Sequence, residues 1–299
     1  MTTDSPMDEP ADFRELAPCP VIDAHAHCFP DPLQAALWAW FDQYTWPVRY
    51  RLPAVESAAF QMNRGLAGQV LLTYAHKPGL ARGLNRFLAA MVAANPGSLG
   101  LAAVHPDDHD PAGVLHQAWQ NPGLVGAKLH LHVLGRPLDD PSFFPIFAAC
   151  ADQGRVINVH AGRQPASPGY GLDVTRICSA ARTEKVLKEF PGLKLIVPHL
   201  GWDETEAYFA LLDRYPDLVL DTTMILADFF PEVTVDLELL ERHSQRVMYG
   251  SDFPNIPYDH TREVRHILGL GLSDRALSDI LWRTADRVFG FGPEEPAHR

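Results

Sequence analysis

Residues 21–27 read Val21-Ile22-Asp23-Ala24-His25-Ala26-His27, a short apolar run that ends in two histidines spaced two apart. In a β-strand this spacing places both imidazoles on one face. If the strand belongs to a parallel barrel, its carboxyl end lies where the catalytic residues of such barrels gather. Two imidazoles on one side of that end provide half of the ligands for a divalent metal, so the rest of the chain must provide the other half.

Short apolar runs recur along the chain at intervals that leave room for a helix each time. They predict eight strands, at residues 21–26, 69–74, 99–104, 124–129, 155–159, 194–197, 218–222 and 247–250. Between them, apolar residues at spacings of three and four predict helices that include 83–94, 143–152, 175–190 and 204–214. Eight alternating strand and helix units favour a (β/α)8 TIM barrel over a doubly wound sheet.

The composition indicates one large barrel that acts on a small molecule. Of the 299 residues, 46% are hydrophobic, enough for a substantial core, and we expect a mobile tail at 1–17 before a single barrel domain at 18–299. The formal net charge of −12, without a basic run, argues against nucleic acid or a membrane surface as partner. The chain shows no signal peptide or membrane span, and its four scattered cysteines lack the spacing of a disulfide framework or zinc site, which predicts a cytoplasmic protein. Whether the barrel forms a homodimer stays open.

The longest connection, residues 28–67, follows the first predicted strand and is rich in aromatic side chains. A connection of this length is usually functional, and we interpret it as a loop and helical insertion that forms a flap over the barrel mouth. In this interpretation Trp46 contributes to an aromatic wall, and Arg49 or Arg51 binds an anionic group of the substrate. The alternative is a surface helix whose aromatic side chains pack on the barrel.

Four predicted strands end in side chains that can bind a metal or carry a proton. His25 and His27 end the first strand; the other candidates, at the ends of the fifth, sixth and eighth strands, are His160, His199 and Asp252. Because the carboxyl ends of barrel strands surround one mouth, we expect these side chains to converge. Imidazoles with one carboxylate suit Zn²⁺, with Mn²⁺, Fe²⁺ and Co²⁺ as alternatives.

The order of these motifs resembles the amidohydrolase superfamily, specifically its amidohydrolase-2 branch of metal-dependent hydrolases and non-oxidative decarboxylases. The resemblance covers residues 20–290 and depends on Asp-x-His-x-His-x-x-Pro at 23–30, Gly-x-Lys-Leu-His at 126–130, Val-His-Ala-Gly at 159–162, His-Leu-Gly at 199–201 and Gly-Ser-Asp-Phe-Pro at 250–254. It implies that one divalent metal is bound by His25, His27, His160 and Asp252. It further implies that His199 activates water or transfers a proton, and Asp252 is expected to take a proton from that water.

The fourth predicted strand raises the question of a second metal. Lys128, His130 and His132 alternate along it, so we expect all three on its inner face. Superfamily members with two metals use a lysine on this strand, carboxylated by CO2, as a bridge, which leaves open a second metal held by Lys128 and His199. In the one-metal interpretation, Lys128 pairs with a carboxylate or binds an anionic substrate, and His130 lies near the substrate.

Two further residues have candidate roles around the metal. Arg163, in a loop rich in Gly and Pro after the fifth strand, could clamp a substrate carboxylate through a bidentate pair; the alternative is an exposed loop arginine. Asp23 is expected to orient the neighbouring backbone and ligands.

Three functions are compatible with these residues. The first is a hydrolase in which metal-activated water attacks the carbonyl of an amide, lactone or ester of a small, anionic or aromatic substrate. The second is a decarboxylase of an unsaturated or aromatic acid, which delivers a proton to carbon and releases CO2. The third is a barrel without catalytic activity that serves as a binding module. Release of CO2, as against cleavage of a ring or an amide, distinguishes the first two.

Overall fold

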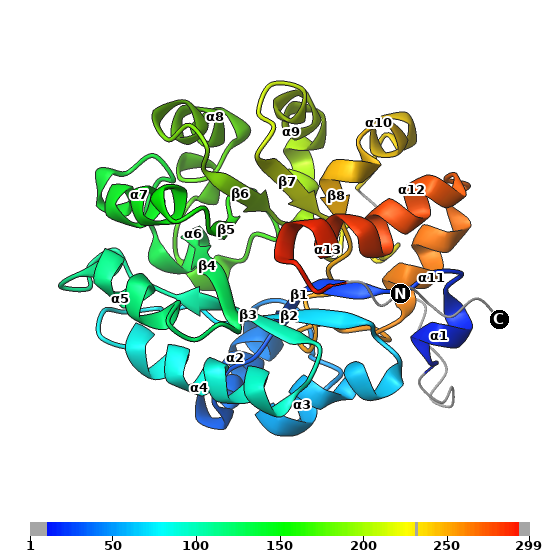
Figure 1. Ribbon diagram of the computed structural model, residues 1–299, viewed down its shortest axis with the longest axis horizontal. Helices are drawn as coiled ribbons and strands as arrows, with labels where there is room; N and C mark the ends of the chain where they lie inside the picture. Colours follow the sequence, from blue (N-terminus) through cyan, green and yellow to red (C-terminus); the bar gives the residue numbers. More distant parts are fainter. Residues whose placement is uncertain (1–10, 231–232, 293–299) are drawn as a thin grey trace.

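Eight parallel strands form one sheet whose strand order follows the sequence. The computed structural model describes residues 11–230 and 233–292, and Figure 1 shows the strands at the centre of a ring of helices. The strands are β1 (Ile22–His27), β2 (Gly68–Leu72), β3 (Ser98–Ala103), β4 (Leu124–His130), β5 (Val156–His160), β6 (Lys194–Val197), β7 (Leu218–Asp221) and β8 (Val247–Met248). The predicted (β/α)8 barrel is confirmed.

The helices alternate with the strands as the apolar spacing predicts. They are α1 (Phe13–Leu16), α2 (Asp31–Tyr44), α3 (Ala54–Phe60), α4 (Ala81–Ala94), α5 (Pro111–Ala118), α6 (Leu131–Leu134), α7 (Phe144–Asp152), α8 (Ala180–Glu189), α9 (Thr205–Leu212), α10 (Leu237–Arg242), α11 (Arg262–Gly269), α12 (Asp274–Ser278) and α13 (Thr284–Phe289). The helix predicted from residue 175 begins only at 180, because the Ser179 hydroxyl accepts a hydrogen bond from the Arg182 N–H and caps it there. Among the described residues, no helix combines the length and apolar character needed to cross a bilayer.

Part of the predicted tail packs on the rest of the protein. Residues 13–16 form α1, where Phe13 is only 1% exposed and its ring centre lies 5.4 Å from that of His260. Burial of this phenyl ring stabilises the segment, so the predicted boundary at residue 17 is too late. Residues 1–10 of the predicted tail lie outside the described residues.

The barrel closes where the chain after β8 meets β1. The Ala24 N–H donates to Tyr249 O at 2.9 Å, and the Asp252 N–H donates to His25 O at 2.9 Å. These bonds carry the chain after β8 along the carboxyl end of β1. As a result, His27 and Asp252 become neighbours although 225 positions separate them in the sequence.

The amino end of the barrel is filled by apolar side chains and covered by α13. Ile22, Val156 and Val219, near the beginnings of their strands, form one apolar cluster with Ala285 and Phe289 of α13. Figure 1 shows α13, in red, lying across the centre of the barrel. The polar residues that follow the strands are therefore left for the opposite end.

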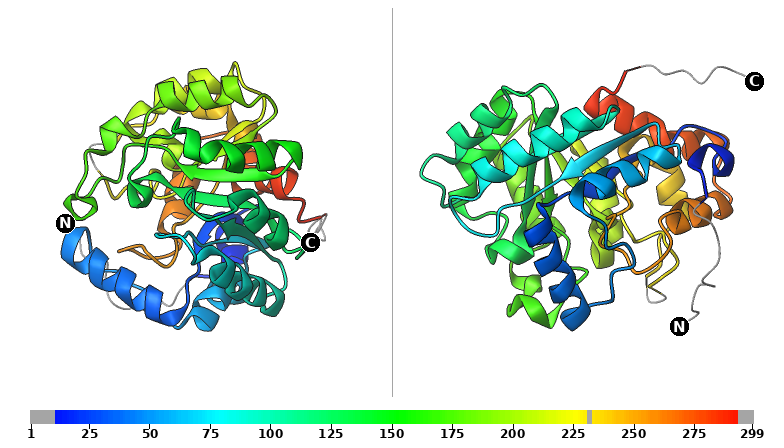
Figure 2. Two further views of the ribbon diagram at one scale, coloured as in Figure 1. Left: turned by 90° about the vertical axis from the view of Figure 1, so that its left-hand side faces the viewer. Right: turned by 90° about the horizontal axis from the view of Figure 1, so that it is seen from below.

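The connection after β1 contains α2 and α3, as the prediction of a helical insertion requires. The left view of Figure 2 shows α2, in blue, standing away from the strands. Its far end contacts the segment after β5, where the Ser167 hydroxyl donates to Tyr44 O at 3.2 Å. The ring of Trp40 also lies 4.9 Å from that of Tyr170. The insertion and the β5 segment thus meet beside the barrel mouth.

Candidate metal centre

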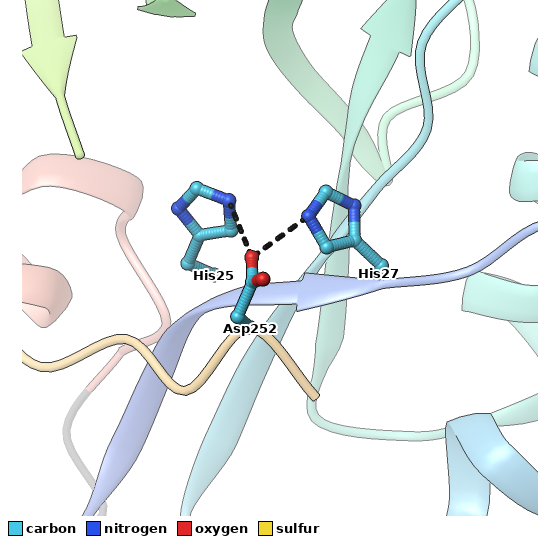
Figure 3. Close-up of side chains that lie close together, drawn as sticks. All are labelled: His25, His27 and Asp252. Atoms are coloured by element: carbon cyan, nitrogen blue, oxygen red, sulfur yellow. Dashed lines mark hydrogen bonds and ion pairs between the residues drawn. The ribbon is translucent and has the colours of Figure 1, made fainter. Parts of the chain in front are cut away.

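Three buried side chains bring their ligand atoms together at the carboxyl end of β1 (Figure 3). His27 Nε2 lies 3.0 Å from Asp252 Oδ1, and His25 Nε2 lies 3.6 Å from the same oxygen. All three ligand atoms lie within 4.8 Å of one another, and no other group of three such side chains does so in the described part of the chain. Three of the four predicted metal ligands therefore converge.

A buried carboxylate orients His25. The Nδ1–H of His25 donates to Asp221 Oδ2 at 3.0 Å, and burial lowers the pKa of His25 well below its ordinary value. In this neutral ring Nε2 carries a lone pair, which faces the Asp252 oxygen at 3.6 Å. An imidazole nitrogen and a carboxylate oxygen that face each other are donors that a divalent metal accepts, so the donor set fits such a metal.

Asp252 and β1 are tied together by the buried carboxylate of Asp23. One oxygen of Asp23 accepts the backbone N–H groups of His25 and Ser251, both at 3.0 Å. Burial opposes ionisation of Asp252, but the neighbouring imidazoles of His27, His25 and His199 together outweigh burial and hold the pKa of Asp252 below its usual range. Asp23 thus orients the backbone on both sides of the centre, as the sequence predicts.

His199 lies in a strained turn directly after β6. The φ angles of His199, Leu200 and Trp202 are +58°, +50° and +55°, in the left-handed region that side chains rarely adopt. The Nδ1–H of His199 donates to Thr223 O at 2.7 Å, and burial lowers the pKa of the ring. Its Nε2 therefore carries a lone pair, and its ring centre lies 6.0 Å from that of His25. This nitrogen is a base adjacent to the metal ligands.

His160, the fourth predicted ligand, lies outside the group of three. Its Nε2–H donates to Gln164 O at 3.1 Å, and its ring centre lies 4.7 Å from that of His199. Burial lowers the pKa of His160 well below its ordinary value, so Nδ1 carries the lone pair. Its role as a metal ligand stays a prediction.

Lys128 lies beneath the metal ligands and is completely buried. Its Nζ donates to Asn158 Oδ1 at 2.6 Å and lies 3.4 Å from His25 Nε2. Burial lowers the pKa of Lys128 to about 8. A carboxylated Lys128 that bridges to a second metal stays a prediction, because the described residues contain no second cluster of ligand atoms around it.

The strand predicted to continue to His132 ends at His130, and α6 begins at the next residue. This corrects the expectation of a single strand face for Lys128, His130 and His132. The Nε2–H of His132 donates to Gly162 O at 2.9 Å, and burial lowers the pKa of His132 to about 4. The ring of His130 stacks on that of His160 at 4.3 Å. Both His130 and His132 still line the mouth of the barrel.

Comparison with known families identifies the family of this chain. The family model described as amidohydrolase matches residues 22–291, which includes all eight strands. The chain belongs to the amidohydrolase-2 family. No curated protein matches the sequence of this chain significantly.

Solved structures share the fold of this chain at low sequence identity. A Pseudomonas putida protein assigned as a 2-pyrone-4,6-dicarboxylic acid hydrolase is 20% identical with a TM-score of 0.63, over 92% of this chain and 99% of that one. A manganese-bound 5-carboxyvanillate decarboxylase from Novosphingobium aromaticivorans is 17% identical with a TM-score of 0.69, over 96% and 100%. The 4-oxalomesaconate hydratase of Rhodopseudomonas palustris is 17% identical with a TM-score of 0.60, over 91% and 96%. At these identities the likeness concerns the fold.

The barrel mouth contains a cavity of about 400 Å³. Many of the side chains that line it are apolar or aromatic; they are Phe29, Leu33, Ala36, Leu37, Trp40, Phe41, Trp46, Tyr74, Val133 and Tyr170. His27, His199 and Asp252 line the same cavity, so these candidate metal-binding and proton-transfer residues are open to a bound molecule. Helix α2 thus contributes a wall of the cavity, as the flap interpretation predicts.

Trp46 has both of the roles that the sequence left as alternatives. It lines the cavity, and its Nε1–H donates to Asn255 O at 2.8 Å. Its ring also packs at 5.8 Å from that of Phe230. Trp46 is therefore a wall of the cavity that is anchored to the segment after β8.

The predicted arginine contacts to an anionic substrate are not in place. The guanidinium of Arg163 pairs with Asp203 at 3.1 Å and with Glu204 at 3.3 Å, and Arg163 does not line the cavity. Arg51 donates to both oxygens of Asp42, at 2.6 and 2.7 Å, and Arg49 likewise lies outside the lining. The acidic residues that engage Arg163 and Arg51 are brought near by the fold and carry no signal in the sequence.

Several residues of the site were not predicted from the sequence. Asp221 orients His25, and its other oxygen accepts the His199 N–H at 3.3 Å. Asp221 is the last residue of β7. The other site residues were identified by their positions at the ends of strands, and Asp221 could have been found in the same way. Tyr74 and Tyr170 line the cavity from loops, where no periodic pattern marks them.

Proposed function

We propose that this protein is a metal-dependent hydrolase that adds water to a carbonyl group of an ester, lactone or amide. The observation that carries the proposal is the tautomeric state of the histidines. His25 and His199 each donate one N–H to a fixed acceptor, at 3.0 and 2.7 Å, which leaves the other nitrogen as a lone pair. Asp252 is an ionised carboxylate beside them. A site made of proton acceptors is suited to deprotonating water.

The metal would be held by His25, His27 and Asp252, with His160 as the further candidate ligand. When bound, a divalent cation supplies Lewis acidity that polarises a carbonyl and makes water more acidic. Zn²⁺ suits this nitrogen and oxygen donor set, and Mn²⁺ is the alternative.

His199 is the residue that moves the proton. Its Nε2 takes a proton from the attacking water as the new C–O bond forms, and returns the proton to the departing oxygen or nitrogen when the carbonyl–heteroatom bond breaks. The Thr223 carbonyl stabilises the protonated ring, because it accepts the Nδ1–H at 2.7 Å throughout. Asp252 is the second proton acceptor in reach of the same water.

A non-oxidative decarboxylase is the second candidate, and the apolar cavity favours it. The apolar walls facing the metal ligands disfavour a charged carboxylate and favour its loss as neutral CO2. One solved relative of this fold is a 5-carboxyvanillate decarboxylase. This reaction needs a proton donor to carbon, whereas His25 and His199 direct lone pairs inward.

A paired activity screen tests the proposal. The protein as purified is given aryl esters, lactones, anilides and matching aromatic acids, with acid release followed by a pH indicator and CO2 release followed in parallel. We expect acid release from carbonyl substrates that is abolished in His199→Gln. Release of CO2 alone would support the decarboxylase, and neither activity would reject both candidates.

A further inference from the structure

As far as the structure describes the chain, the walls of the cavity away from the metal ligands contain no carboxylate, lysine or arginine. Within the described residues, Asp252 is the one carboxylate in the lining, and the lining contains no lysine or arginine. A carboxylate bound along these walls would therefore meet no lysine or arginine side chain of the described residues.

The cations near the cavity are engaged elsewhere. Arg163 is paired with Asp203 and Glu204 at 3.1 and 3.3 Å. The Nζ of Lys128 is completely buried beneath the metal ligands and donates to Asn158 Oδ1 at 2.6 Å. Neither can neutralise an anionic group that enters the cavity without breaking these contacts.

The remaining walls are shaped for a flat apolar body. Leu37, Trp40 and Phe41 of α2 form one side, and the Tyr170 ring lies 4.9 Å from that of Trp40. Aromatic side chains offer large faces against which a planar ring stacks favourably. A cavity of about 400 Å³ is large enough for more than one ring.

We propose that this site binds a planar substrate with an extended apolar body and a single charged or polarised group, and that this group is the one that reacts. Molecules with a second carboxylate are rejected. The identity of the reacting end rests on the proposed function; the selection of the body rests on the walls alone. A second carboxylate would lose its hydration against aromatic walls without gaining a lysine or arginine partner from the described lining in return. We expect the second carboxylate to weaken binding at least about ten-fold, or about 1.4 kcal/mol.

Calorimetric titration with ligands that share one ring system tests the proposal. The protein as purified is titrated with 2-naphthoate, 2-naphthamide and naphthalene-2,6-dicarboxylate. We expect measurable binding of the first two and at least about ten-fold weaker binding of the dicarboxylate. Equal or tighter binding of the dicarboxylate, or no binding of the first two, would overturn the proposal.

A substitution in the wall tests whether charge is the cause. Leu37 lies on α2, lines the cavity and is partly exposed, so it can accept a longer polar side chain. Leu37→Arg should improve binding of the dicarboxylate relative to 2-naphthoate at least about ten-fold, whereas Leu37→Gln, of similar length without the charge, should not. An unchanged ratio in Leu37→Arg would refute the charge argument.

The two proposals fail in different ways. Selective binding of 2-naphthoate without acid or CO2 release from any tested compound would reject the proposed reaction and keep the substrate class. Turnover of carbonyl substrates by a protein that prefers the dicarboxylate would keep the reaction and reject the substrate class.

Discussion

Replacing Asp221 with asparagine should weaken metal binding about ten- to one-hundred-fold, or about 1.4 to 2.7 kcal/mol, the usual effect of removing a group that orients a histidine ligand. The carboxylate uses both oxygens. Oδ2 accepts from His25 Nδ1 at 3.0 Å and from Asn158 Nδ2 at 3.3 Å, while Oδ1 accepts from the His199 N–H at 3.3 Å and from the Thr223 hydroxyl.

An asparagine offers one acceptor oxygen in place of two. If its NH2 faces His25, then Nδ1 loses its acceptor and the ring proton is free to move to Nε2, where it blocks the metal. If the NH2 faces the other way, the turn that carries His199 loses its support. Either orientation damages the site, and the first damages the metal ligand directly.

Competition with a chromophoric chelator measures the metal dissociation constant of wild type and variant. Asp217→Asn, at the other end of β7, is the matched control because it changes the same charge away from the site. The melting temperature of each metal-free protein verifies that the variant folds. Wild-type metal affinity in a folded Asp221→Asn protein would refute the argument that Asp221 sets the tautomer of His25.

Three further predictions follow from other contacts. His199→Gln should lower turnover about 10²- to 10⁴-fold with metal content unchanged; loss of the metal together with turnover would instead make His199 a ligand. Burial raises the pKa of Glu263 to about 8, while the ordinary value is 4.5. The folded state therefore retains the Glu263 proton up to a higher pH than the unfolded state does. The free energy of unfolding of wild type, relative to that of Glu263→Gln, should be greatest below pH 4.5 and fall as pH rises toward 8, with a limiting slope of about 1.4 kcal/mol per pH unit. Denaturant titrations at pH 5, 6, 7 and 8 that give a constant difference between the two proteins would contradict this. Trp46→Ala should weaken 2-naphthoate binding at least about ten-fold. Trp46→Phe keeps an aromatic wall but loses the hydrogen bond to Asn255 O, and should weaken binding less. Equal affinities of wild type and Trp46→Ala in calorimetry would mean that Trp46 only packs.

The barrel and the core of the site could be predicted because both depend on local patterns. Apolar runs mark the strands, and residues that follow such runs gather at one end of a parallel barrel, which is why His25, His27 and Asp252 meet. Their spacing in the chain carries no information about the distance between them; closure of β8 on β1 supplies it.

The remaining features depend on long-range contacts and on turns. The salt bridges that remove Arg163 from the cavity involve Asp203 and Glu204, which reach it through a strained turn that sequence patterns do not reveal. The strand predicted through His132 ends at His130 because α6 starts there, and alternation of residue types cannot show such a turn. The packing of Phe13 on His260 could not be predicted either, because the two residues are distant in the sequence and no pattern links them.

Metal content per chain, measured by plasma mass spectrometry on protein purified without added metal or chelator, tests the central claim most directly. The comparison is wild type, His25→Ala and His76→Ala, the last a histidine at the mouth of the same cavity but outside the ligand group. We predict about one equivalent of zinc or manganese in wild type and His76→Ala, and its loss in His25→Ala. Absence of metal from wild type after reconstitution, or full retention in His25→Ala, would contradict the metal centre argued from His25, His27 and Asp252.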